Sequence, residues 1–373
     1  GDWAVEQLRA LAATKAKNRK PFFMGVGFIR PHTPLIVPQK FFDMFPVDKI
    51  SLPEILDGDS EDTFAQTIRG LPEGKEPNSE RTEDMGSKLF HKLVESYESR
   101  DEALRHFIQA YLASIASVDE QVGRILDVID TTELKDNTII VLTSDHGWGM
   151  GEKDYLYKNS LWQESTRIPL IVRAPGVALA NTTCDRPVSL VDIYPTLCDL
   201  CDLEGDTMKN EKGHPLDGHS FRPLLEDPTN GTWTGPSEAL TALYKWRMKY
   251  DPHEESYALR SSDWRYIRYE NGKEELYNTA SDPNEWGNLA TKTKHEARIQ
   301  RFRQTLASRL PEKGVVPPQP QWKAPGKPEP KSNEYWKDLY FKKNPDADAD
   351  KDGTLSWPEH QAHKKAVAEK GTQ

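Results

Sequence analysis

The sequence predicts an α/β fold in which helices flank a mostly parallel sheet. Apolar runs at residues 22–28, 139–144 and 168–172 have the length and composition of buried strands. Helical periodicity lies between them, most clearly over residues 101–129, where apolar side chains form one long stripe. Strands that alternate with helices in this way are typical of a parallel sheet.

The remaining elements of this first part follow in chain order. We expect a helix over residues 2–17 before the first strand, and another over residues 190–203 after the third. Residues 57–88 are rich in glycine, proline, serine and charge, which favours a long surface loop. Together these elements predict one α/β domain over residues 1–226.

A smaller α+β subdomain with antiparallel strands is expected over residues 227–310. Its clearest signal is Asn271-Gly272 between two apolar runs, a pair that favours a tight hairpin. Residues 311–331 are dense in proline, which favours an extended linker, and residues 332–373 form a separate segment. The short strands and the closing helix are expected at residues 258–260, 264–269, 275–277 and 294–310.

Composition excludes several classes of partner. The 373 residues include 49 basic and 59 acidic side chains, so the net charge of −10 gives no footprint for nucleic acid. No stretch approaches the roughly 18 apolar residues of a membrane helix. We therefore expect neither nucleic acid nor a membrane as partner.

The C-terminal segment contains the pattern of an EF-hand calcium loop. Such a loop places oxygen ligands at positions 1, 3, 5, 7 and 9, a glycine at position 6 and a bidentate carboxylate at position 12. An acidic solvated tail is the alternative interpretation, but glycine and glutamate both fall in register. The residues at these positions are Asp348, Asp350, Asp352, Gly353, Thr354, Ser356 and Glu359.

Metal-capable side chains follow two of the predicted strands. Asp145 and His146 come directly after the 139–144 run, and His32 follows the 22–28 run beyond Pro31. Parallel strands end at the same edge of a sheet, so these side chains are expected at one rim. A helix cap or a turn is the structural alternative for the Asp145-His146 pair.

Several sequence blocks, in order, resemble a type I sulfatase of the alkaline-phosphatase superfamily, most closely the iduronate-2-sulfatase-like members. The resemblance covers roughly residues 1–310, and it implies that residues 1–226 are part of an alkaline-phosphatase-like catalytic domain. The blocks are FFMGVGFIRPHTP (22–34), YLASIASVDEQVGRILDVID (111–130), TSDHGWGMG (143–151), Tyr157-Lys158, RIPLIVRAP (167–175), LVDIYPTL (190–197) and residues 266–289.

The resemblance also implies roles for individual residues. Asp145 and His146 match ligands of a calcium ion that holds the sulfate ester, although histidine is a poorer calcium ligand than a carboxylate. His146 is alternatively a catalytic contact to the nucleophile or the ester oxygen. Lys158 matches a lysine that contacts the sulfate and stabilises developing charge. His32 matches a second sulfate contact, which would protonate the leaving alcohol.

A sulfated saccharide is the substrate that the resemblance implies. In the smaller subdomain, Trp246, Arg247 and His253 are expected to contact it, because aromatic and basic side chains suit sulfated glycans.

The nucleophile motif of the family is missing. Type I sulfatases convert the cysteine of a C-x-P-S-R motif to formylglycine, and neither Cys184, Cys198 nor Cys201 has that context. We therefore expect a C-terminal portion of a longer sulfatase, inactive alone, whose partner is an N-terminal segment with the formylglycine. Two alternatives are a related phosphodiester or phosphonate hydrolase, and a nonenzymatic remnant that binds calcium and sulfated glycan.

The resemblance and the calcium loop both favour an extracytoplasmic location, periplasmic or secreted. Extracellular calcium modules bind at roughly 10⁻⁴–10⁻³ M, which suits a compartment rich in calcium.

Overall fold

The computed structural model divides the chain into two compact units, residues 1–314 and 315–373. Trp246 and Arg247 lie outside the described residues, as does most of the expected linker. The described residues are 1–14, 20–63, 85–205, 215–243, 251–313, 340–342 and 344–370.

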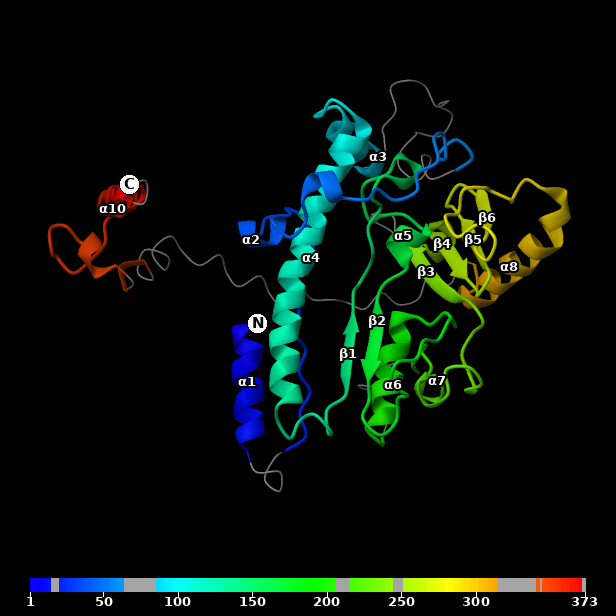
Figure 1. Ribbon diagram of the computed structural model, residues 1–373, viewed down its shortest axis with the longest axis horizontal. Coiled ribbons are helices and arrows are strands. Elements are labelled where there is room, and N and C mark those ends of the chain that lie inside the picture. Colours follow the sequence, from blue (N-terminus) through cyan, green and yellow to red (C-terminus); the bar gives the residue numbers. More distant parts are fainter. Residues whose placement is uncertain are drawn as a thin grey trace. The chain divides into compact units, whose positions relative to one another are not determined.

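One long helix, α4 (Arg100–Asp130), organises the first part of unit 1 and confirms the predicted helix at 101–129. Ser99 caps it by accepting a hydrogen bond from the backbone N–H of Glu102 at 3.2 Å. Helix α1 (Asp2–Ala13) lies alongside (Figure 1) and buries Val5 and Leu8 against the C-terminal end of α4. The predicted helix at residues 2–17 therefore exists but ends at Ala13, where the next residue is extended.

Short helices pack along the rest of α4. They are α2 (Gln39–Phe42), η2 (Val47–Lys49) and α3 (Met85–Val94), and each contacts α4. The prediction of a loop over residues 57–88 is wrong at its end, because residues 85–88 begin α3. Phe90 explains the helix, because its side chain is buried against α4 residues. This burial stabilises a helical turn although the sequence before Phe90 is polar.

Strands β1 (Ile140–Thr143) and β2 (Leu170–Arg173) confirm two predicted strands, but they pair antiparallel, with Ile140 opposite Arg173. The expectation of a mostly parallel sheet is thus wrong for the described strands. A parallel pair needs a crossover, usually a helix, that returns the chain to the starting edge. Between β1 and β2 lie only η4 (Glu152–Asp154) and the single turn α5 (Gln163–Thr166), so the chain comes back downward (Figure 1).

Residues 22–28 are described without strand pairing, so the predicted first strand is wrong for this structure. The segment lies beside α4 and runs in the same direction as β1 (Figure 1). Its alternation survives, because Phe22 and Met24 pack with Ile140 while Phe23 is 87% exposed. Alternating burial therefore persists over Phe22–Met24 without ladder hydrogen bonds, but not at Val26, which is 40% exposed.

After β2 the chain forms η5 (Leu190–Asp192), α6 (Ile193–Leu200) and α7 (Arg222–Glu226). The helix predicted at residues 190–203 is confirmed, with its end at Leu200. Ser189 and Asp192 form a capping box at its start, which satisfies two orphan N–H groups.

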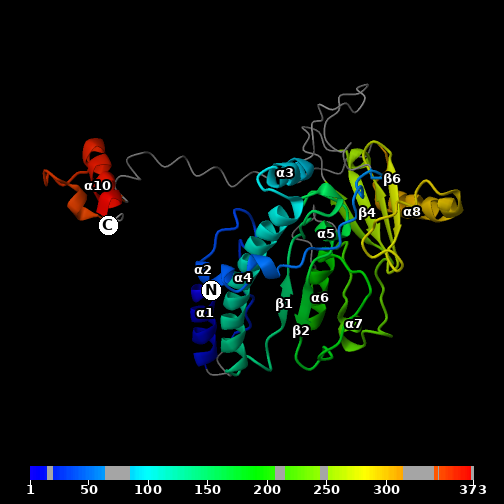
Figure 2. The same cartoon turned by 45° about the horizontal axis from the view of Figure 1, so that its top comes forward.

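The second part of unit 1 is an antiparallel sheet in the order β3-β4-β5-β6, which confirms the expected antiparallel strands. Helix α8 covers one face (Figure 2), where Tyr257, Tyr266 and Leu276 pack against Phe302. The opposite face packs on Trp162 and neighbouring residues. The bounds are β3 (Ala239–Leu243), η6 (Pro252–Glu254), β4 (Ser256–Arg260), β5 (Trp264–Arg268), β6 (Glu274–Asn278), η7 (Thr293–His295) and α8 (Glu296–Arg309).

Unit 2 contains η8 (Pro345–Ala347) and α10 (Trp357–Lys370), which flank the acidic loop. Its small interior includes Ala347 and Leu355, both buried. Across the described residues of both units, no helix combines the length and apolar character needed to span a membrane.

Candidate active site

Asp145 and His146 stand at an exposed edge where β1 ends. Together with Lys158 and His32, which the sequence analysis groups with them, they are called the strand-end rim. The Asp145 carboxylate accepts a hydrogen bond from the backbone N–H of His146 at 3.0 Å, and its side chain is 83% exposed. Oδ2 of Asp145 lies 3.5 Å from Nε2 of His146. The strand end thus brings one carboxylate and one imidazole together.

The hydrogen bonds of His146 suit a metal ligand. Its Nδ1 lies 2.8 Å from the carbonyl oxygen of Gly147, and a carbonyl only accepts, so Nδ1 carries the proton. Nε2 then has a free lone pair directed toward Asp145. Ligands at roughly 2.0–2.6 Å from one cation lie about 3–3.5 Å apart, and a backbone carbonyl commonly orients a ligating histidine. The spacing of Asp145 Oδ2 and His146 Nε2 is therefore compatible with two ligands of one cation.

Gly147 lets the chain turn closely after His146. Its N–H donates to the carbonyl of Ser165 at 2.8 Å, and an added Cβ would lie 2.0 Å from the carbonyl oxygen of Glu164. Only glycine fits this approach without displacing the α5 backbone. The backbone after His146 is thereby held against α5.

A second backbone contact ties the residue before Lys158 to the segment that follows His146. The N–H of Gly149 donates to the carbonyl of Tyr157 at 2.8 Å, and the Tyr157 ring packs on Trp148 with centroids 5.3 Å apart. Lys158 is partly exposed and, within the described ranges, its ammonium makes no hydrogen bond or ion pair. It is therefore a cation available to a ligand.

His32 is exposed on a loop held by its neighbours. Arg30 donates to the carbonyl oxygens of His32 and Ile36 at 3.0 and 3.2 Å. Nδ1 of His32 lies 2.5 Å from the Thr33 carbonyl oxygen, so it donates there and leaves Nε2 outward. Among the described residues, no hydrogen bond or ion pair joins His32 to the Asp145-His146 pair.

His253, an expected substrate contact of the smaller subdomain, lies in η6 rather than on the rim. Its Nε2 donates to the Pro311 carbonyl at 2.8 Å, and its backbone N–H is held by Asp251 at 2.9 Å. It lines a cavity beside the β5–β6 hairpin. His253 and Asp145 therefore stand on different elements of unit 1.

A buried charge cluster, which the sequence analysis missed, joins the two parts of unit 1. It comprises Lys153, Asp59, Glu285 and Arg265, with every side chain at most 2% exposed. Lys153 Nζ donates to Asp59 at 2.8 Å and to the Glu285 carbonyl at 2.6 Å, while Arg265 pairs with the Glu285 carboxylate. Each charge thus has a partner from a distant part of the chain.

The backbone at this cluster is in the left-handed region. Lys153 and Glu285 have φ values of 54° and 56°, which side chains with a Cβ rarely adopt. A backbone conformation of this kind persists only where the surrounding contacts hold it in place. A lysine or a glutamate in a sequence does not suggest a positive φ, as a glycine would. The sequence therefore contains no pattern from which this cluster could be predicted.

Glu164 lies between the cluster and the rim. Burial, with the nearby charges of Glu285 and Glu152, raises the pKa of Glu164 to about 7. Its own backbone oxygen is the one that faces Gly147. This titratable carboxyl therefore belongs to the residue whose backbone oxygen limits the space beside Gly147.

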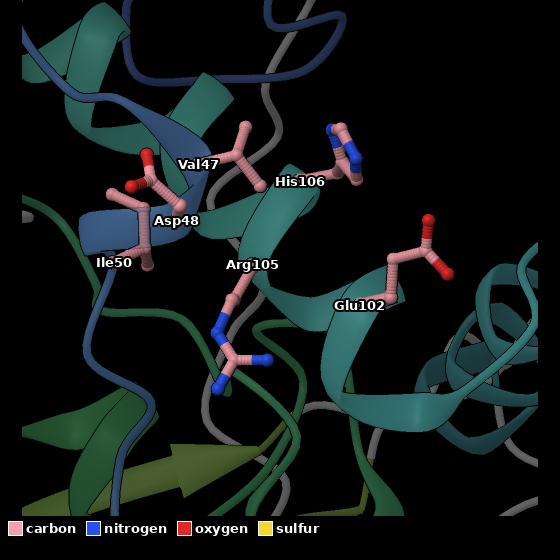
Figure 3. A pocket seen from close by; sticks show the side chains of 6 residues that line it. All are labelled: Val47, Asp48, Ile50, Glu102, Arg105 and His106. Atoms are coloured by element: carbon pink, nitrogen blue, oxygen red, sulfur yellow. The ribbon is translucent and has the colours of Figure 1, made fainter.

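A cavity of about 630 Å³ opens at the first turns of α4, but its polar groups do not converge. Figure 3 shows Arg105 and His106 extending in opposite directions, and the two carboxylates pointing apart. We therefore assign it no role. Its lining residues are Val47, Asp48, Ile50, Glu102, Arg105 and His106.

The acidic loop of unit 2 has its ligand atoms close together. Oxygens of Asp348, Asp350 and Asp352 all lie within 4.8 Å of one another. Oδ1 of Asp348 is buried without a hydrogen-bond partner. Hydrogen bonds from the hydroxyl and backbone N–H of Ser356 hold the pKa of Glu359 at about 2, so it is a carboxylate.

Residues 3–203 match the sulfatase family, and residues 151–312 match the C-terminal region of N-sulphoglucosamine sulphohydrolase. The first match spans more than half of the chain. This protein therefore belongs to the sulfatase family, whose members are sulfuric ester hydrolases.

Individual relatives agree. A sulfatase of Formosa agariphila is 33% identical over 308 residues, which are 82% of this chain and 52% of the relative. Human iduronate 2-sulfatase is 31% identical, over 60% of this chain and 46% of its own length. The chain thus spans about half the length of the curated relatives it matches.

Solved structures show the same alkaline-phosphatase-like fold. The phosphonate monoester hydrolase of Agrobacterium radiobacter has a TM-score of 0.61 and 25% identity, over 82% of this chain and 59% of that chain. A protein solved with its substrate D-glucosamine-2-N,6-O-disulfate has a TM-score of 0.50 and 27% identity, over 56% of this chain and 41% of that chain.

Proposed function

We propose that this chain supplies the metal-binding and sulfate-binding part of a sulfatase site that hydrolyses sulfate esters of saccharides. The observation that carries the proposal is the convergence of Asp145 and His146, 3.5 Å apart, at the end of β1. Membership in the sulfatase family gives the reaction class. Relatives named for iduronate and solved with a glucosamine disulfate support the saccharide.

The rim residues have separate tasks in this proposal. Asp145 and His146 hold calcium, which supplies positive charge for the sulfate oxygens. The ammonium of Lys158 binds the same anion and stabilises the charge that develops as the ester bond breaks. Because Nδ1 of His32 is tied to a carbonyl, Nε2 is the atom that would carry the proton to the leaving alcohol.

The nucleophile is proposed to come from a segment outside the 373 residues, as formylglycine, and the chain alone is proposed to be inactive. The exposed apolar side chains support a docking surface for such a segment. Phe23, Ile29 and Ile171 are 87%, 78% and 62% exposed, on the 22–29 segment and β2. Large apolar side chains with this much exposure suit a surface that another segment would cover.

The test is sulfate release from sulfated saccharides by the protein isolated from its natural source. Lys158→Gln should lower kcat/KM on the order of 10²–10³-fold without a change in melting temperature. Lys49→Gln, at an exposed lysine beside Asp48, is the matched control and should leave the rate unchanged. Full activity in Lys158→Gln would remove the assigned role.

A phosphonate or phosphodiester hydrolase is the second candidate, favoured by the likeness to the Agrobacterium radiobacter enzyme. The same preparation should be assayed with a phosphonate monoester. A higher kcat/KM for this substrate than for any sulfated saccharide would favour the second candidate. If neither substrate is cleaved by the isolated protein, a nonenzymatic remnant that binds calcium and glycan becomes the better account.

We further propose that unit 2 binds calcium in an EF-hand-like loop from Asp348 to Glu359. The unpartnered Oδ1 of Asp348 beside the carboxylates of Asp350 and Asp352 supports this ligand set. Gly353, with φ of 85°, makes the sharp turn that the loop needs. The carbonyl of Thr354, Ser356 and Glu359 complete the proposed set.

Calcium titration tests the loop. Calcium should raise the melting temperature, and Asp350→Ala should remove most of that rise, since a missing carboxylate weakens a hard-cation site. Asp346→Asn, two residues before the loop, is the control and should keep the response. An Asp350→Ala variant that responds like the parent would contradict the assignment.

An extracytoplasmic location is also proposed, because such loops are often tuned to millimolar calcium outside the cytoplasm. Fractionation of the source cells checks it, and recovery of the protein only with the cytoplasm would contradict it.

A further inference from the structure

The cavity that contains His253 has a chemistry of its own. It encloses about 330 Å³ between the β5–β6 hairpin and the C-terminal half of α8. That volume is at the lower end of the roughly 300–1,000 Å³ typical of ligand pockets, which is enough for one sugar unit. Its lining residues are His253, Arg268, Gly272, Glu274, Arg303, Leu306, Ala307 and Leu310.

Charge pairing leaves one guanidinium of this cavity in excess. Arg268 and Glu274 face each other across the two strands, but Glu274 is bound by Arg303 through both carboxylate oxygens. Tyr266 donates a further hydrogen bond to the same carboxylate. The negative charge of Glu274 is therefore neutralised by Arg303.

Arg268 keeps donors for a ligand. Its Nη2 lies 3.5 and 3.3 Å from the carbonyl oxygens of His253 and Glu255, which are long contacts, and its guanidinium lies 5.3 Å from the Tyr257 ring centre. Among the described residues, no carboxylate forms an ion pair with it. A guanidinium has five N–H donors in a planar fork that suits oxyanions.

The other walls suit the body of a sugar. Leu306 and Ala307 of α8, with Leu310 just after it, give an apolar wall. Because Nε2 of His253 donates to Pro311, Nδ1 of the neutral ring is an acceptor that suits a sugar hydroxyl. The cavity thus combines a cation, an imidazole and an apolar wall in a chain whose net charge is −10.

We propose that this cavity is a second saccharide subsite, which binds a sulfated sugar unit with its sulfate on Arg268, apart from the strand-end rim. The inference rests on the proposed saccharide substrate, and it extends that function to a unit of the glycan that is not cleaved. Such a subsite would hold a longer chain while the rim acts on another unit.

The experiment is an NMR titration of the full chain with D-glucosamine-2-N,6-O-disulfate, followed at the amide of Gly272 on the cavity edge. The amide should shift on titration, and Arg268→Gln should weaken this binding about tenfold, because a charge-assisted hydrogen bond is lost. Arg298→Gln removes an equal charge from α8, over Trp264 and outside the cavity, and should bind like the parent. Ala307→Trp, at an exposed helix position, should block the cavity without a change of charge.

The outcomes separate this subsite from the rim. Unchanged affinity at Gly272 in both Arg268→Gln and Ala307→Trp overturns the subsite, as does equal binding of unsulfated D-glucosamine. Tighter binding of D-glucosamine 6-phosphate than of the disulfate overturns the sulfate assignment. Lys158→Gln should keep the Gly272 response; if it abolishes that response while Arg268→Gln does not, the sugar binds at the rim, and the proposed function stands without the subsite.

Discussion

The buried charge cluster and the strand-end rim use similar side chains in opposite ways. Lys153, Asp59, Arg265 and Glu285 are almost completely buried, and each is paired. At the rim, the carboxylate of Asp145 is 83% exposed. Lys158 there has no protein partner among the described residues. Charges that are already paired contribute to structure, whereas charges left unpaired at a surface remain available to a ligand.

The comparison has an energetic consequence. Burial of an ion costs several kcal/mol of desolvation free energy, which its partner offsets. Loss of the partner therefore strongly lowers the free energy of unfolding. An exposed ion is solvated in any case, so its removal leaves stability almost unchanged. Substitutions in the two regions should therefore separate stability from ligand binding.

The largest effect is expected from Arg265→Leu. This change leaves the Glu285 carboxylate buried without its guanidinium, and should lower the free energy of unfolding by about 3–5 kcal/mol. Urea denaturation followed by tryptophan fluorescence measures it. The double variant Arg265→Leu with Glu285→Gln should recover part of the loss, because the uncompensated charge is gone. A loss below about 1 kcal/mol in the single variant would show that water reaches the cluster.

Glu164→Gln should change the pH dependence of stability. The folded-state pKa of Glu164 is about 7, above the ordinary value of 4.5, so the folded state holds this proton more tightly. Its favourable contribution is complete below pH 4.5 and is lost as pH rises through about 7, by roughly 3 kcal/mol at about 1.4 kcal/mol per pH unit. The variant should therefore gain stability over the parent at pH 8 but not at pH 4. Parallel curves of the two proteins between these pH values would contradict the shift.

Gly147→Ala tests the joint between the two regions. Its Cβ would lie 2.0 Å from the Glu164 carbonyl oxygen, so the backbone must move, at a cost of about 1–3 kcal/mol. Gly123→Ala is the matched control, since nothing lies within 4 Å of its Cβ in α4. The control should stabilise by about 0.5–1 kcal/mol. Thermal melts compare them, and equal melting temperatures would show that the approach at Gly147 is not tight.

The smallest effect on stability is expected from Asp145→Asn. The carboxylate is exposed, so the free energy of unfolding should change by less than about 0.5 kcal/mol. Sulfate release by the protein from its natural source should nevertheless fall at least tenfold, because a carboxylate ligand of the proposed cation is lost. Calcium at high concentration should restore part of the rate. A large loss of stability would place Asp145 among the structural charges instead.

Local pattern in the sequence was enough for the elements that carry one. The apolar stripe of α4, the run of β1 and the Asn271-Gly272 hairpin all appear where periodicity and turn chemistry place them. The position of the pair Asp145-His146 just after a strand was predicted for the same reason, since the strand itself is recognisable. Features that depend only on neighbouring residues could therefore be predicted from the sequence.

Features that depend on distant residues were not accessible. The antiparallel pairing of β1 with β2 follows from a connection without a crossover helix, which composition does not reveal. Lys153 meets Asp59 and Glu285 across 94 and 132 residues, and a lysine, an aspartate and a glutamate in loops read as solvated surface. The cavity at Arg268 likewise depends on how Arg303 from α8 neutralises Glu274.

The most direct test of the central claim is the mass of the protein isolated from its natural source, with peptide mapping of any residues beyond those printed above. The account predicts a mass above 42.5 kDa, with a cysteine-derived formylglycine in the additional residues. A mass of 42.5 kDa for a protein that releases sulfate without formylglycine in any associated chain would contradict it.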